Sequence, residues 1–338
     1  MSHRPPRDSD ETARLAEERR RSTRRLTRHK GLATWGETLV PLGEFRRAAA
    51  SSGQTLSPEE RGEAVRQHIA AVPDPTPVEG PWSRIAVFGG VYNNHFGLEA
   101  LLEDAARRGA EAVYCLGDLG GFGPNPEKVW PLLLQGGVRA IQGNYEESLA
   151  SGREDCNCGY TDPRDNHFAG LSYGYTARSC SPEFKAWMGA LPLRRRVRLG
   201  DRELLLVHGS PRRINEFLFR STSPVPFLEV LLDQQGCDGV LCTHTGLHWH
   251  RRLPSGRDVV NVGVIGRPAN DGNTNVWYAL LDARQGIELV PLAYDHPALA
   301  AEMRREGLPE EFVETILTGW WTTCLEILPA RERAASRF

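Results

Sequence analysis

The stretch Ala112-Val113-Tyr114-Cys115-Leu116-Gly117-Asp118 decides the fold class, because it reads as a buried strand that ends in a glycine turn and a carboxylate. A similar apolar strand covers residues 84–88, and residues 98–105 between the two strands have the apolar spacing of a helix. A third strand, residues 138–141, ends at Gly143-Asn144. Alternation of strands and helices is typical of parallel βαβ units, so the sequence predicts an α/β protein.

Four of the predicted strands are followed by a polar residue of a type that binds metal ions: Asp118, Asn144, His208 and His244. In open α/β sheets, ligand sites gather at the carboxyl ends of strands, so we expect these side chains to lie together. One carboxylate, one amide oxygen and two imidazoles form a mixed nitrogen and oxygen shell that suits Fe, Mn or Zn. The sequence therefore predicts a site for a divalent or trivalent transition metal ion.

The motifs Gly117-Asp118, Gly143-Asn144, Val207-His208-Gly209 and His244-Thr245 occur in an order that resembles the calcineurin-like metallophosphoesterase superfamily. Within that superfamily the sequence is similar to the small bacterial phosphodiesterase type, over about residues 84–315. The resemblance implies a four-layer α/β/β/α sandwich, in which two mixed sheets are flanked by helices and the metal site lies at one edge. It also implies metal-dependent hydrolysis of a phosphomonoester or a phosphodiester.

The departures from the superfamily pattern concern one of its two metal ions. The resemblance implies that Asp118, Asn144, His208 and His244 hold the second ion, and all four are present. Three of the four positions that would hold the first ion carry other residues, namely Gly90, Tyr92 and Gly246. We therefore expect a remodelled site with one metal ion per chain rather than two.

Several residues are candidates for the remaining roles. Additional metal ligands could come from His248, or from Cys156 and Cys158, although His248 could equally form a surface pair with His250. Tyr145 replaces the histidine that the superfamily uses at the leaving group, and we expect Tyr92 and Asn94 to orient the phosphate, so the predicted catalytic residues are Tyr145, Tyr92 and Asn94. The forked guanidinium groups predicted to bind the anionic oxygens are those of Arg212, Arg213 and Arg267.

The composition of the 338 residues is that of a globular protein, with 40% hydrophobic and 25% charged residues, and no apolar run is long enough to span a membrane. The net charge of −2 does not favour nucleic acid as a partner, although residues 1–30 carry a local excess of basic residues. Seven cysteines, an odd number in a chain of this length, favour a reducing, cytoplasmic location.

The predicted organisation begins with a flexible Arg-rich leader (1–30) and continues with a helical extension and Pro-rich linker (31–83). Within that linker, residues 73–81 carry four prolines and are not expected to join a sheet. The metallophosphoesterase domain follows at 84–315, with an irregular, lid-like insert at 151–181, and a helical tail occupies 316–338.

Two other functions compete with phosphoester hydrolysis. The loss of three ligands could give a mononuclear or iron-dependent enzyme of a different reaction class on the same fold. The chain could also be a non-catalytic sensor or scaffold that binds a phosphoryl ligand. The expected ligand of the enzyme is a small-molecule phosphoester, and the termini, including Trp320-Trp321, could dock a protein partner or a second copy of the chain.

Overall fold

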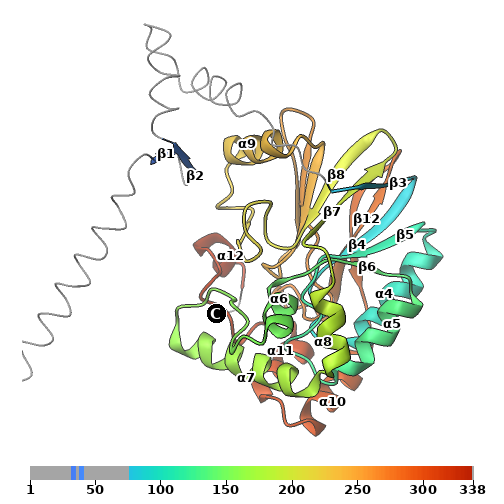
Figure 1. Ribbon diagram of the computed structural model, residues 1–338. Helices are drawn as coiled ribbons and strands as arrows, with labels where there is room; N and C mark the ends of the chain where they lie inside the picture. Colours follow the sequence, from blue (N-terminus) through green and yellow to red (C-terminus); the bar gives the residue numbers. More distant parts are fainter. Residues whose placement is uncertain (1–31, 36–37, 42–75, 337–338) are drawn as a thin grey trace, which may run out of the picture. The chain divides into compact units, whose positions relative to one another are not determined.

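A computed structural model describes residues 32–35, 38–41 and 76–336 of the chain (Figure 1). The chain divides into two compact units, residues 1–70 and 71–338. In the first unit, β1 (Leu32–Trp35) pairs antiparallel with β2 (Thr38–Pro41). These strands lie where a helical extension was predicted, and their threonine, tryptophan and valine residues favour extended backbone. The predicted leader, residues 1–30, lies outside the described residues.

Two mixed sheets form the centre of the second unit. The five-stranded sheet has the order β13-β12-β4-β5-β6, with bounds Gly286–Leu292, Val276–Asp282, Arg84–Phe88, Ala112–Cys115 and Arg139–Ala140. The six-stranded sheet has the order β10-β11-β9-β8-β7-β3, with bounds Trp249–Arg252, Asp258–Asn261, Gly239–Cys242, Arg202–Val207, Arg194–Leu199 and Val78–Trp82. Strands β4, β5 and β6 run parallel to one another, as do β8, β9 and β11.

Alternation of side chains along the strands produces the layers. In β4, Ile85 and Val87 point into a core that also holds side chains of β7, β8, β9 and β11 from the other sheet. The intervening Ala86 and Phe88 pack in a second core with α4 (His95–Arg107) and α5 (Val129–Gln135). On the outer face of the six-stranded sheet, α9 (Val225–Gln235) covers β8, β9 and β11. The predicted α/β/β/α sandwich is therefore confirmed.

The remaining helices complete the second unit (Figure 1). They are η1 (Pro126–Lys128), α6 (Asn144–Ser151), α7 (Pro163–Ser179), α8 (Pro182–Gly189), α10 (His296–Arg305), α11 (Glu310–Thr318) and α12 (Ala330–Ala334). Among the described residues, no helix is both long and apolar enough to cross a lipid bilayer. The second compact unit reaches residue 338, and α11 crosses the boundary at 315/316 where the domain was expected to end.

Two local expectations were wrong. Residues 78–82, within and just beyond the predicted linker, form β3 and pair with β7. The ladder tolerates Pro81 because β3 is an edge strand whose register shifts between Glu79 and Trp82. The insert at 151–181 is irregular only in its first part, since α7 begins at Pro163 with Asp162 as its side-chain cap.

A buried carboxylate joins α10 to α4 and η1. Glu302 accepts hydrogen bonds from Lys128 and Asn125 (3.1 Å), and its Oε2 lies 3.0 Å from His95 Nε2. Burial alone would raise the pKa of Glu302, but the hydrogen bonds from Lys128, His95 and Asn125 lower it to about 2. The ionised carboxylate therefore stabilises the folded state.

We predict that Glu302→Gln lowers the free energy of unfolding by up to about 3 kcal/mol at pH 7. Because the folded pKa lies below the ordinary value of 4.5, this contribution is complete above pH 4.5 and is lost as the pH falls toward 2. Urea unfolding of both proteins between pH 7 and pH 2 measures the difference, which should shrink across that interval. Glu310→Gln removes an exposed ion pair with Arg304 and serves as the control; an equal effect in both variants would contradict the prediction.

Candidate metal centre

Loops at the carboxyl ends of four strands bring the predicted ligands together. Asp118 follows β5, Asn144 begins α6 after β6, His208 follows β8 and His244 follows β9. His208 Nε2 lies 3.0 Å from Asn144 Oδ1, 3.0 Å from His244 Nδ1 and 3.3 Å from Asp118 Oδ2. All four side chains are buried. Residues from both sheets thus converge on one point.

The hydrogen bond at the other nitrogen of His208 fixes the direction of its ring. His208 Nδ1 lies 2.6 Å from the carbonyl oxygen of Leu116, which can only accept a hydrogen. This bond assigns the proton of the neutral ring to Nδ1 and leaves the lone pair of Nε2 directed at the cluster. A metal-binding histidine is commonly held in this way by a carbonyl group.

Two of the candidate ligands, Asp118 and His244, have an unusual left-handed backbone conformation. Asp118 and His244 have φ angles of 57° and 66°, in the left-handed region that is costly for residues other than glycine. Gly143 allows the close approach of the loops, because a Cβ there would lie 2.5 Å from Asp118 Oδ1 and 2.9 Å from His208 Cε1. The surrounding hydrogen bonds therefore hold the site in a strained arrangement.

Glu146 supplies several of those hydrogen bonds, and sequence reasoning assigned it no role. Its carboxylate accepts from the backbone N–H groups of Asp118 (2.8 Å), Leu119 (2.8 Å) and Gly143 (2.7 Å). Glu146 occupies the third position of α6, the capping-box position, and this is the signal that could have identified it. It is a positioning residue that joins the Asp118 loop to the Asn144 loop.

The charges of the cluster suit a cation. Burial would raise the pKa of Asp118, but the interactions with the His208 ring outweigh burial and lower it. Burial and the neighbouring His208 lower the pKa of His244 to about 3, so this ring is neutral. For His208, burial disfavours the charged ring, but the Asp118 carboxylate raises its pKa.

The residues present fit one metal ion. Ligand atoms of Asp118, His208 and His244 lie within 4.8 Å of one another, the one such cluster in the described part of the chain. With the proton of the neutral His208 ring on Nδ1, the lone pair of its Nε2 faces the oxygens of Asn144 and Asp118, and a bound cation would offset the repulsion between these acceptors. Asn144 donates its Nδ2 to the carbonyl of Cys156 (2.7 Å), and this leaves Oδ1 directed at His208. Two imidazoles with oxygen ligands form a shell that Fe, Mn or Zn favours.

A pocket opens beside these ligands. It is lined by Asp118, His244 and Arg267 together with a largely aromatic set: Tyr92, Phe122, Tyr145, Tyr160, Phe168, Phe217 and Phe312. Phe217 stacks on His244 with ring centroids 4.4 Å apart. Cys324, from the C-terminal segment, also reaches the pocket. Among the described residues that line the pocket, Asp118 is the only one with a carboxylate.

The structure separates the three predicted catalytic residues. Tyr92 and Tyr145 line the pocket, and burial raises the pKa of both, so both phenols keep their protons. The Tyr145 hydroxyl lies 3.0 Å from Ser172 Oγ. Asn94 is fully buried as the cap of α4, accepting from Gly97 N (2.9 Å) and donating to the Ile265 carbonyl (2.8 Å). The prediction that Asn94 orients phosphate was wrong, because both ends of its amide are used in the fold.

Two of the three predicted arginines lie away from the pocket. Arg212 pairs with Glu216 and lies over the ring of Phe227, and Arg213 is exposed. Arg267, in the loop after β11, is 5% exposed and lines the pocket. Arg212 and Arg213 are close to His208 in the sequence, but only the more distant Arg267 reaches the pocket among these three.

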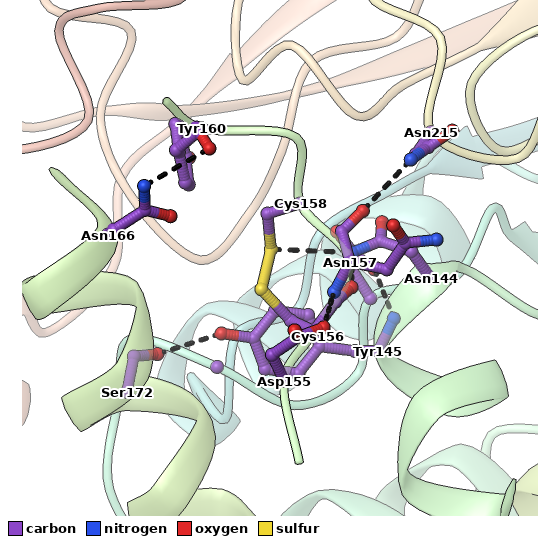
Figure 2. Close-up of a disulfide and its surroundings, with 12 residues drawn as sticks. Asn144, Tyr145, Asp155, Cys156, Asn157, Cys158, Tyr160, Asn166, Ser172 and Asn215 are labelled. Atoms are coloured by element: carbon purple, nitrogen blue, oxygen red, sulfur yellow. Dashed lines mark hydrogen bonds between the residues drawn. A yellow bond between two sulfur atoms is a disulfide. The ribbon is translucent and has the colours of Figure 1, made fainter. Parts of the chain in front are cut away.

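The predicted additional ligands are engaged elsewhere. His248 stacks on Trp277 with ring centroids 3.7 Å apart and does not line the pocket. Cys156 and Cys158 are joined in a disulfide (Figure 2), so neither offers a free thiolate in this structure. The disulfide loop still contacts a metal ligand, because Asn144 Nδ2 lies 3.5 Å from Cys158 Sγ as well as bonding the Cys156 carbonyl.

The chain is similar to known proteins in sequence and in fold. Residues 84–286, which contain all four candidate ligands, match the family model described as the calcineurin-like phosphoesterase superfamily domain. The chain is 23% identical over 255 residues to an uncharacterized protein of Methanocaldococcus jannaschii, covering 70% of this chain and 98% of that protein.

Two solved structures are similar in fold. One is a metallophosphoesterase from Sphaerobacter thermophilus, with 24% identity and a TM-score of 0.55, covering 70% of this chain and 98% of that chain. The other is a hypothetical protein from Pyrococcus horikoshii OT3, with 22% identity and a TM-score of 0.59, covering 71% of this chain and 99% of that chain.

We predict that Glu146→Gln weakens metal binding by about ten- to a hundredfold at pH 8. Burial and the neighbouring Asp118 raise the pKa of Glu146 to about 7, so at pH 8 the carboxylate is mostly ionised and accepts the three backbone hydrogen bonds. The substituted amide is isosteric, but it places an NH₂ group against backbone N–H donors. Metal titration measures the change in affinity, and urea unfolding shows whether each variant folds. Glu147→Gln, on the partly exposed side of the same helix, is the matched control, and equal results for both variants would exclude the positioning role.

The disulfide predicts a simple thiol count. Five cysteines are free, so denatured protein kept from reductant should titrate with five thiols, and seven after reduction. Cys156→Ser should raise the unreduced count to six, because Cys158 becomes a sixth free thiol. Seven thiols in unreduced wild-type protein would show that the pair is not oxidised.

Proposed function

The chain belongs to the calcineurin-like phosphoesterase superfamily, whose model matches more than half of its residues, and on this premise we propose that it is a metal-dependent phosphoric ester hydrolase. The substrate is a phosphomonoester or a phosphodiester. Asp118, Asn144, His208 and His244 would hold a transition metal ion, with Fe, Mn and Zn as the candidates.

One observation carries the proposal, namely the convergence of the four ligand side chains around His208 Nε2. Hydrogen bonding within the protein does not account for this cluster, because the lone pair of His208 Nε2 faces the acceptor oxygens of Asn144 and Asp118. A structural role for four buried polar groups would pair each of them. The pocket beside the cluster gives a small molecule access to it.

When bound, such an ion lowers the pKa of a water molecule and polarises a phosphoryl oxygen. The chain's own residues supply the rest of the chemistry. Tyr145 keeps its proton and faces the pocket, so its O–H can donate to the leaving-group oxygen, while Ser172 holds the hydroxyl in place. The aromatic lining limits the access of bulk water and strengthens the electrostatic interactions inside the pocket.

We predict that wild-type protein purified without chelators contains bound transition metal and hydrolyses p-nitrophenyl phosphate or its bis-ester. His208→Ala should lose the metal and lower hydrolysis by more than about a hundredfold, because it removes the ligand nearest to the other three. Elemental analysis of each purified chain and a phosphoester panel provide the two measurements.

The control is His167→Ala, which removes an exposed histidine of α7. It should retain both metal and activity. Metal retained at the wild-type level in His208→Ala would contradict the ligand assignment. Metal-loaded wild-type protein that hydrolyses no ester of the panel would contradict the hydrolase proposal.

A further inference from the structure

We propose that Arg267 binds the phosphoryl oxygens of the ligand from the half of the pocket where the superfamily places its other metal ion. The site would then combine one metal ion with one guanidinium group. This inference rests on the proposed function for the identity of the ligand, a phosphate ester, but its geometric basis is separate from the metal cluster.

Aromatic rings hold the guanidinium at the pocket wall. The Cζ atom of Arg267 lies 3.5 Å from the ring centroid of Trp321 and 5.9 Å from those of Tyr92 and Phe122. Trp321 is itself fixed, because its Nε1 donates to the Pro268 carbonyl (2.6 Å) and its backbone N–H donates to Asn270 Oδ1 (2.8 Å). Stacking on these rings orients a planar cation and leaves its N–H edge available.

That edge lacks the partners that a buried guanidinium normally has. Arg267 is 5% exposed, and its Nε is buried without a hydrogen-bond partner. Within residues 76–336, no carboxylate forms an ion pair with it. Cation–π contacts offset only part of the cost of burying a charge, which an anion would offset more fully. The unpartnered cation faces the same pocket as Asp118 and His244.

The residues present do not fit a second metal ion in this half of the pocket. A Cβ at Gly246 would lie 2.8 Å from Trp321 Cη2 and 3.2 Å from Arg267 Nη2. A Cβ at Gly90 would lie 2.4 Å from Val264 Cγ1 and 2.9 Å from Cζ of Tyr92. Aromatic rings and the guanidinium thus fill the space that ligand side chains would need.

The charges are matched to phosphate. With one divalent ion, the Asp118 carboxylate and the Arg267 guanidinium, the pocket carries a net positive charge that a phosphoryl dianion would neutralise. A guanidinium donates two parallel hydrogen bonds to two oxygens of one phosphoryl group. Arg267 would therefore fix the orientation of the group and stabilise the charge on its oxygens during reaction.

The test compares Arg267→Gln and Arg267→Lys with wild-type protein, using Arg284→Gln in an exposed turn as the matched control. Calorimetric titration of the metal-loaded proteins with inorganic phosphate measures binding without turnover. Elemental analysis measures metal per chain, and p-nitrophenyl phosphate gives kcat and KM. Thermal unfolding shows whether each variant folds. If Arg267→Gln does not fold, Arg267→Lys, which keeps the positive charge, still tests the proposal.

We expect one metal ion per chain in all four proteins. Phosphate binding should weaken about ten- to a hundredfold in Arg267→Gln, less in Arg267→Lys, and not at all in Arg284→Gln. Guanidinium ions added at millimolar concentration should restore part of the phosphate binding to Arg267→Gln.

An unchanged phosphate affinity in both Arg267 variants, or two metal ions per wild-type chain, would overturn the inference. These outcomes differ from those that bear on hydrolysis. Metal-loaded protein that binds phosphate through Arg267 but cleaves no ester would refute the hydrolase and leave the anion site standing. If the protein hydrolyses esters but both Arg267 variants bind phosphate as tightly as wild-type protein, the anion site is refuted and the hydrolase proposal stands.

Discussion

The hydrogen bond between His208 Nδ1 and the Leu116 carbonyl joins the two sheets at the edge where the site lies. His208 follows β8 of the six-stranded sheet, and Leu116 follows β5 of the five-stranded sheet. Because this bond sets the direction of Nε2, the distances from His208 to Asp118 and Asn144 depend on how the sheets pack. The core between the sheets, which includes the buried rings and aliphatic groups of Tyr114, Leu206 and Leu241, fixes that packing. The geometry of the metal centre is therefore a property of the whole sandwich.

The loops on this edge contain residues in an unfavourable backbone conformation. Left-handed backbone at Asp118 and His244 costs of the order of 1 to 3 kcal/mol at each residue. Glu146 offsets this cost for Asp118 by accepting three backbone hydrogen bonds at once. The resulting arrangement holds the candidate ligands together within the protein itself, which would lower the cost of ordering them when an ion binds. Stability elsewhere in the fold thus maintains an arrangement that the loops alone would not adopt.

Local patterns in the sequence predicted the strands and the candidate ligands, whereas the layers followed from the resemblance to the superfamily. The apolar runs and the polar residue after each strand are visible within a few residues, and the sheet edge brings those polar residues together. Other features depend on contacts between distant parts of the chain. Arg267 meets Trp321 across 54 positions, and no spacing rule distinguishes it from Arg212 and Arg213. Helix α7 was missed because its apolar residues lack clear helical spacing, although Asp162-Pro163 is a start signal.

The two halves of the pocket differ in where they come from. The metal-binding half is built from strand ends within the residues that match the family model, 84–286. The other half depends on Trp321, Cys324 and Phe312, which lie beyond that match and hold Arg267 or close the pocket. Asp165 of α7 anchors this C-terminal segment by accepting from the backbone N–H of Cys324 (2.7 Å). The C-terminal segment therefore supports the half of the pocket that holds Arg267, whereas strand ends within residues 84–286 build the half that holds the candidate ligands.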